Sequence, residues 1–145
     1  MKENLMRELK FRAWDNLEKR MRKVVSLHWQ DGKLVSAKLE GDNEPTPIEG
    51  RLEIEQYAEP ILSDRLICEN DIVVDNLSLN AHRGEIAYLV TLEAGAFWYK
   101  PLRRLKGSGG FSRDSKLVAY EHIHYKTIGN IHENPELLEE KHEDL

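Results

Sequence analysis

The sequence predicts a mainly β protein, folded as a small and strongly bent sheet or barrel, with one short helix near the C-terminus. Many short runs alternate between apolar and polar residues with the two-residue period of a half-buried strand. Asn, Asp, Gly or Pro separates one run from the next. Three such runs follow each other between residues 70 and 100, and we expect this stretch to form the centre of the fold.

The length and composition indicate one soluble domain over residues 1–145. A chain of this length buries enough surface to fold without a metal ion or a disulfide. The single cysteine, Cys68, cannot pair within the chain, which fits a reducing cytosol. The first seven residues lack the apolar core of a signal peptide, and the longest apolar runs are too short to span a bilayer. We therefore expect a cytoplasmic protein.

The N-terminal part, about 7–40, is predicted to be a β-hairpin preceded by one strand. Residues 9–14 alternate, and residues 21–29 and 33–39 read as the two arms of a hairpin. The dipeptide Asp31-Gly32 between them suits a type I′ turn, because both residues tolerate positive φ. An acidic loop with two prolines, 41–50, follows this hairpin.

The barrel core is predicted over about 51–131, and an acidic segment over 132–145. The expected strands of this core are 52–57, 70–74, 84–90, 95–99, 116–120 and 121–129. Asn134-Pro135 has the residue types of a helix start, so we expect a short helix over 135–144.

The net charge of −5 is unevenly distributed along the chain. Two basic blocks, 1–23 and 100–116, carry +4 and +5, and two acidic blocks, 40–71 and 133–145, carry −8 and −5. Such blocks either steer charged partners toward the protein or neutralise each other within the fold.

The basic segment 100–113 is the best candidate binding site. It follows three consecutive aromatic residues, 97–99, and is predicted to be a loop because glycine and serine fill 107–110. Basic side chains neutralise phosphates and aromatic rings stack on bases, but a loop of this kind also suits an acidic protein partner or has no binding role. The candidate binding residues, including two from the first strand, are Lys100, Arg103, Arg104, Lys106, Phe111, Arg113, Lys10 and Arg12.

No catalytic constellation is evident, and we predict neither enzyme activity nor a metal or cofactor. The chain has no phosphate-binding loop, and one cysteine excludes zinc sites that need two or four sulfurs. His122 and His124, with His132, could supply three nitrogens to a metal, but solvent-facing histidines on a strand are the simpler interpretation. Glu53 and Glu55 share a strand face that we expect to be solvated.

Three segments resemble the YopX family of phage and prophage proteins. They are residues 10–15 (KFRAWD), residues 69–73 (ENDIV) with the strands from Gly84 and Gly95, and residues 128–137 (IGNIHENPEL). The resemblance implies a mainly β fold with an SH3-type barrel, encoded by a temperate phage or prophage, with no catalytic residues to transfer. Together with the strand and helix patterns above, the predicted fold is a small SH3-like barrel with an added N-terminal hairpin and a short C-terminal helix. In these motifs we expect Phe11 and Trp14 to pack, Asp15 to form a turn, Gly129 to bend the chain and Asn134-Pro135 to cap a helix.

The sequence departs from the family pattern at several positions. Residues 57–65 replace the usual Tyr-Thr-Gly-Leu segment and its following turn, and 100–115 is longer than usual. Asn70 stands where the family has glycine, and because asparagine is the next-best residue for a left-handed turn, we expect the turn to persist.

These observations predict a phage or prophage accessory protein in the host cytoplasm. We expect a non-enzymatic protein-binding module, acting through exposed strand edges and the basic segment 100–113, with self-association as one form of binding. The alternatives are a nucleic-acid-binding module that uses the same segment, and a metal-dependent hydrolase that uses His122 and His124.

Overall fold

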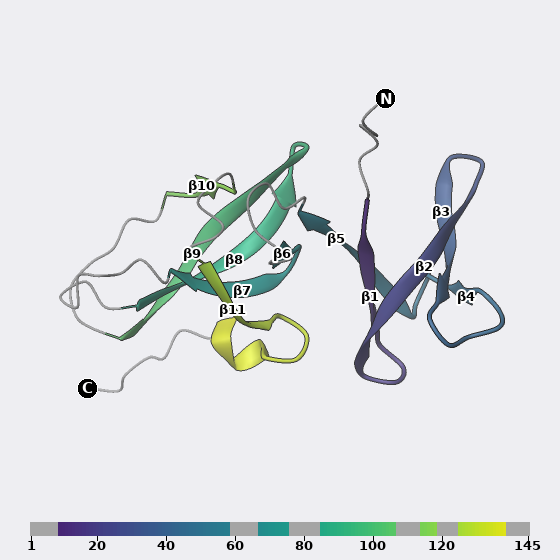
Figure 1. Cartoon of the computed structure of the whole chain (residues 1–145), viewed down its shortest axis with the longest axis horizontal. Coiled ribbons are helices and arrows are strands. Elements are labelled where there is room, and N and C mark those ends of the chain that lie inside the picture. The colour runs from purple at the N-terminus through teal and green to yellow at the C-terminus, as the bar shows by residue number, and fades with distance from the viewer. Residues whose placement is uncertain (1–8, 59–66, 76–84, 107–113, 119–124, 139–145) are drawn as a thin grey trace, which may run out of the picture. The chain divides into compact units, whose positions relative to one another are not determined.

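The computed structural model describes residues 9–58, 67–75, 85–106, 114–118 and 125–138. These residues form eleven strands and one 3-10 helix, which confirms the predicted mainly β fold (Figure 1). The chain divides into two compact units, Met1–Glu59 and Pro60–Leu145. No helix in the described ranges is long and apolar enough to cross a membrane.

The first unit is a curved antiparallel sheet with the strand order β4-β3-β2-β1-β5. Its strands are β1 (Phe11–Asp15), β2 (Arg20–Gln30), β3 (Lys33–Leu39), β4 (Thr46–Pro47) and β5 (Leu52–Ala58). The predicted hairpin is confirmed: Asp31 and Gly32 have φ angles of 51° and 77°, as a type I′ turn requires. β5 pairs with β1 over five consecutive residues, so it belongs to the first unit, although the predicted barrel core began at residue 51.

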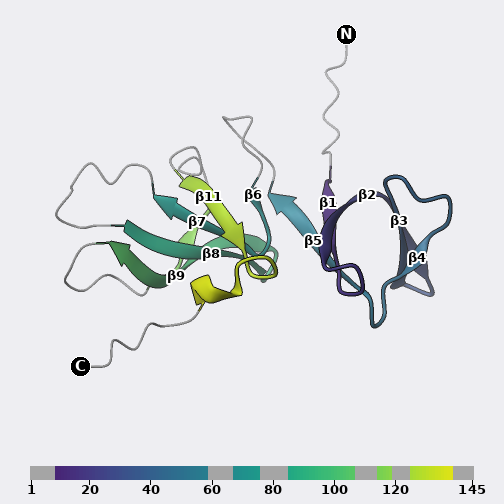
Figure 2. The ribbon, with the colours of Figure 1, turned by 90° about the horizontal axis from the view of Figure 1, so that it is seen from below.

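β2 divides its pairing between two neighbours. Its first four residues pair with β1, and its residues from Val24 onward pair with β3, with a bulge at Val25. Figure 2 shows the sheet curving from β1 through β2 to β3. The buried side chains of Ala13, Ala37 and Leu39 form the core of this unit together with Leu52.

The second unit is an antiparallel sheet with the order β10-β9-β8-β7-β11. Its elements are β6 (Ile67–Cys68), β7 (Asp71–Asp75), β8 (Glu85–Glu93), β9 (Ala96–Lys106), β10 (Lys116–Leu117), β11 (Tyr125–Asn130) and the 3-10 helix η2 (Pro135–Leu138). Asn70 has a φ of 69°, so the expected left-handed turn before β7 is present.

Three buried tyrosines show that this second sheet is strongly bent. The rings of Tyr99 on β9 and Tyr125 on β11 stack with centroids 4.0 Å apart, and Tyr88 packs edge-on against both. In a flat sheet the three strand spacings between β9 and β11, roughly 4.8 Å each, would separate these strands by about 14 Å. The sheet must therefore curl so that β9 and β11 approach each other.

The described strands nevertheless form an open sheet and not a closed barrel. Closure would require pairing between β10 and β11, and no such pairing occurs among the described residues. β10 is only two residues long and offers few backbone groups for that purpose. The SH3-like form of the predicted barrel is therefore not confirmed.

β9 continues through a segment predicted to be a loop. We expected the strand to end before Pro101, but β9 runs to Lys106 with bulges at Leu102 and Leu105. β10 pairs with β9 only at Trp98 and Tyr99. Beyond Tyr99, no described strand pairs with this edge of β9, so the edge does not need the N–H that Pro101 lacks. A proline at such an edge does not interrupt the strand, which explains the error.

The β8–β9 turn contains an alanine in a conformation that suits asparagine. Ala94 and Gly95 have φ angles of 51° and 78°, close to those of Asp31 and Gly32 in the β2–β3 turn. We expect Ala94→Asn to raise the free energy of unfolding by about 0.5–1 kcal/mol, because asparagine tolerates positive φ better than alanine. Urea denaturation would measure it. Asp31→Ala is the matched control and should lower stability; equal stability of both variants with the wild type would contradict the argument.

Residues 128–137, which we call the closing motif, pack against one another where β11 ends. Asn130 Oδ1 accepts hydrogen bonds from the N–H groups of His132 and Glu133, at 3.0 and 2.9 Å. Asn134 Oδ1 accepts from the N–H of Asn130 at 3.2 Å, so this side chain points back to β11 and does not cap the helix as predicted. Only its backbone oxygen accepts from the helix, from the N–H of Leu137. Of the predicted helix 135–144, the described part is η2, and the remainder lies outside the described residues.

Gly129 is required by the close approach of Asn134. A Cβ at residue 129 would lie 2.3 Å from Asn134 Oδ1, which its hydrogen bond to the Asn130 N–H holds in place. We expect Gly129→Ala to destabilise the second unit by about 1–3 kcal/mol through this overlap. In an Asn134→Ala background the same change should cost less, and urea denaturation of the four variants measures the coupling. Additive costs would show that the overlap is relieved elsewhere.

Candidate functional site

The described residues split the predicted binding residues between the two units. Lys100, Arg103 and Arg104 lie on β9, and Lys106 ends that strand. Phe111 and Arg113 lie outside the described residues. The other two, Lys10 and Arg12, are in the first unit.

The basic residues of β9 do not form a single cluster. The bulge at Leu102 places Lys100 opposite Leu89 and Arg103 opposite Ala87, so these two share a face, while Arg104 lies opposite Ile86 on the other face. None of the three is a free cation, since Lys100 Nζ pairs with Glu93 Oε1 and both arginines have partners.

The aromatic residue beside this pair is also engaged. Trp98 Nε1 donates a hydrogen bond to the backbone oxygen of Glu93, at 3.3 Å, and its ring is half-buried. Glu93 therefore holds both Trp98 and Lys100 at the end of the β8–β9 hairpin. The surface predicted for nucleic acid or an acidic partner is partly occupied by contacts within the hairpin itself.

Arg12 is buried in an ion pair and is not part of an exposed basic face. Its Nε donates to Glu55 Oε1 at 2.8 Å, and the two residues are direct neighbours across β1 and β5. They are 8% and 1% exposed. The guanidinium also lies 6.0 Å from the ring centre of Tyr57. We expected Glu53 and Glu55 to face solvent together. Glu53 is exposed, as expected, but the expectation is wrong for Glu55, which is buried where Arg12 compensates the charge of its carboxylate.

Asp15 forms the predicted turn at the end of β1. Its Oδ1 accepts hydrogen bonds from the N–H groups of Leu17 and Glu18, at 2.9 and 3.1 Å. Its backbone oxygen accepts from the N–H of Lys19 at 2.7 Å. An aspartate at the first turn position makes these contacts readily because its short carboxylate reaches amides two and three residues ahead.

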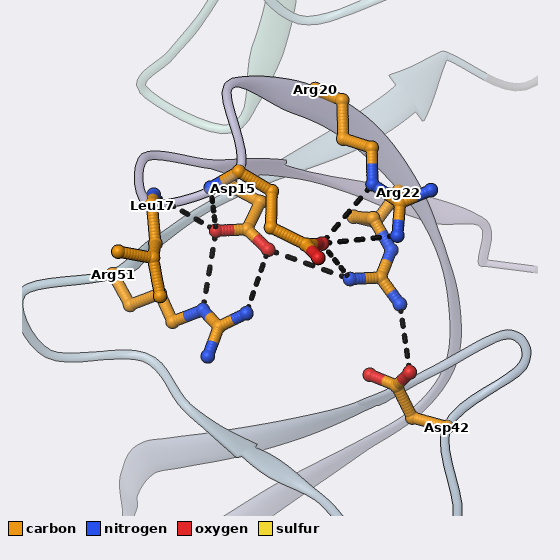
Figure 3. Close-up of polar contacts among 7 residues, drawn as sticks. Asp15, Leu17, Arg20, Arg22, Asp42 and Arg51 are labelled. Carbon is orange, nitrogen blue, oxygen red and sulfur yellow. Dashed lines mark hydrogen bonds and ion pairs between the residues drawn. The ribbon is translucent and has the colours of Figure 1, made fainter.

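Two arginines converge on the same buried carboxylate (Figure 3). Arg51 donates from Nε to Asp15 Oδ1 at 3.2 Å and from Nη2 to Oδ2 at 3.0 Å. Arg22 donates from Nη1 to Asp15 Oδ2 at 3.4 Å and to Glu18 Oε2 at 2.8 Å. Its Nη2 lies 3.0 Å from Asp42 Oδ1. The cluster thus joins the β1–β2 turn, β2, the loop after β3 and the start of β5.

The Asp15 carboxylate is held in its charged form. The hydrogen bond from Arg51 lowers the pKa of Asp15 far below its ordinary value, the amides of Glu18 and Leu17 lower it further, and burial opposes them. The same contact raises the pKa of Arg51. A carboxylate has about four lone-pair positions, and five donors already occupy those of Asp15. Asp15 is therefore neither a general base nor a metal ligand, and the cluster has a structural role.

The described residues contain no group of three or more His, Cys, Asp or Glu side chains that could hold a metal ion. His132 is half-buried in the closing motif, while His122 and His124 lie outside the described residues.

Sequence reasoning missed an exposed apolar surface on the β2–β3 arm, which we define as residues 24–39. Val25 and Trp29 are each 59% exposed, whereas Leu27 between them packs on the core. The period of two predicts that Val25, Leu27 and Trp29 share one side of a strand. This is wrong for Val25, because the bulge at that residue breaks the period and places Val24 with Leu27 on the core.

These features define a mainly β protein with two antiparallel sheets whose Asp15 and Arg12–Glu55 ion clusters stabilise the fold. The chain belongs to the YopX family: the family model described as YopX protein matches residues 10–139. Its fold is similar to the crystal structure of protein EF1440 from Enterococcus faecalis, with 25% sequence identity and a TM-score of 0.62. That match covers 91% of this chain and 99% of the other. No curated protein matches this chain.

Proposed function

We propose that this YopX protein is a non-enzymatic protein-binding module of a phage or prophage, acting in the host cytoplasm through the β2–β3 arm. The exposed Trp29 carries this proposal. A large aromatic side chain that is mostly exposed, on an arm whose Val25 is exposed as well, is typical of a protein interface. The structural roles of Asp15 and Arg12 support a binding role over a catalytic one, because these charged side chains are committed to holding the fold.

An affinity pull-down from infected host lysate tests this proposal. The bait would be the wild type, Trp29→Ser and the control Leu17→Ser, which removes an apolar side chain that is 71% exposed in the β1–β2 turn. We expect protein prey that survives nuclease, is lost with Trp29→Ser and is retained with Leu17→Ser. Prey that binds all three baits equally would overturn the assignment to the arm.

A nucleic-acid-binding module is the second candidate, supported by the shared face of Lys100 and Arg103 beside Trp98 on β9. Binding of labelled single-stranded DNA or RNA should then weaken steeply with salt, and Arg103→Glu should weaken it further. Affinity that does not change with salt would exclude this role for β9.

The third expectation, a metal-dependent hydrolase, depends on His122 and His124 and gains no support from the described residues.

A further inference from the structure

We draw no further inference here: the strongest candidate, the β2–β3 arm with its exposed Val25 and Trp29 and with the edge of β2 over residues 24–30 that no described strand pairs with, is already the surface of the proposed function, and nothing among the described residues shows what covers it.

Discussion

Replacing Asp15 by alanine is expected to lower the free energy of unfolding of the first unit by about 3–5 kcal/mol. The change leaves the guanidinium groups of Arg51 and Arg22 without their shared carboxylate, and removing one partner of a buried ion pair costs about this much. It also removes the acceptor for the N–H groups of Leu17 and Glu18 in the turn. Hydrogen exchange of the β1 and β5 amides would measure the loss in this unit separately from the other.

Asp42→Asn is the matched control for Asp15→Ala. Asp42 contacts the same Arg22 at 3.0 Å, but its side chain is partly exposed, so the pair is weaker. We expect a cost of less than about 1 kcal/mol. If the two variants were equally stable, Asp15 would not be the centre of the cluster.

The lowered pKa of Asp15 also predicts acid sensitivity of the first unit. The folded state holds this carboxylate in its charged form, whereas the unfolded chain protonates it near its ordinary pKa of 3.8. The stability that it contributes is therefore fully present above that pKa and is lost as the pH falls below about 4. Denaturation measured between pH 7 and pH 3 should show a smaller decline for Asp15→Ala than for the wild type, and parallel declines would contradict this assignment.

Replacing Glu55 by alanine is expected to cost about 3–5 kcal/mol as well. The change leaves the buried guanidinium of Arg12 without the carboxylate that neutralises it. The double variant Arg12→Met with Glu55→Leu should recover most of this loss, because an apolar pair of similar volume often replaces a buried ion pair without cost. Urea denaturation of the single and double variants gives the coupling between the two residues.

Glu53→Ala is the control for Glu55→Ala on the same strand. Glu53 is exposed, so its replacement should change stability by no more than about 0.5 kcal/mol.

The double variant Arg12→Met with Glu55→Leu could also be as unstable as Glu55→Ala alone. That result would mean that the cost comes from lost packing and not from the uncompensated charge of Arg12.

Local sequence pattern was sufficient for most of the strands. The period of two located β2 and β3, and Asp31-Gly32 identified the turn between them, because both signals depend on neighbouring residues. The Asn70 turn was predictable for the same reason. The end of β9 was not predictable from local sequence, because Pro101 is tolerated in the strand only where β10 leaves that edge of β9 unpaired.

The candidate sites were harder to predict because burial depends on distant partners. Arg12 and Glu55 are 43 residues apart in the chain, and neither residue shows in its own neighbourhood that it will meet the other. Arg51 likewise reaches Asp15 across 36 residues. The bulge at Val25, which breaks the period of two within β2, also left no signal in the local sequence.

The stacking of Tyr99 on Tyr125 has a consequence for folding during synthesis. All strands of the first unit lie within residues 11–58, so this unit can fold while the rest of the chain is still being translated. The tyrosine core of the second unit stays incomplete until β11 has left the ribosome and paired with β7, about 50 residues earlier in the chain. A nascent chain that stalls before Tyr125 would therefore carry a folded N-terminal unit followed by an apolar sheet without its closing strand, which is the form that chaperones and proteases recognise.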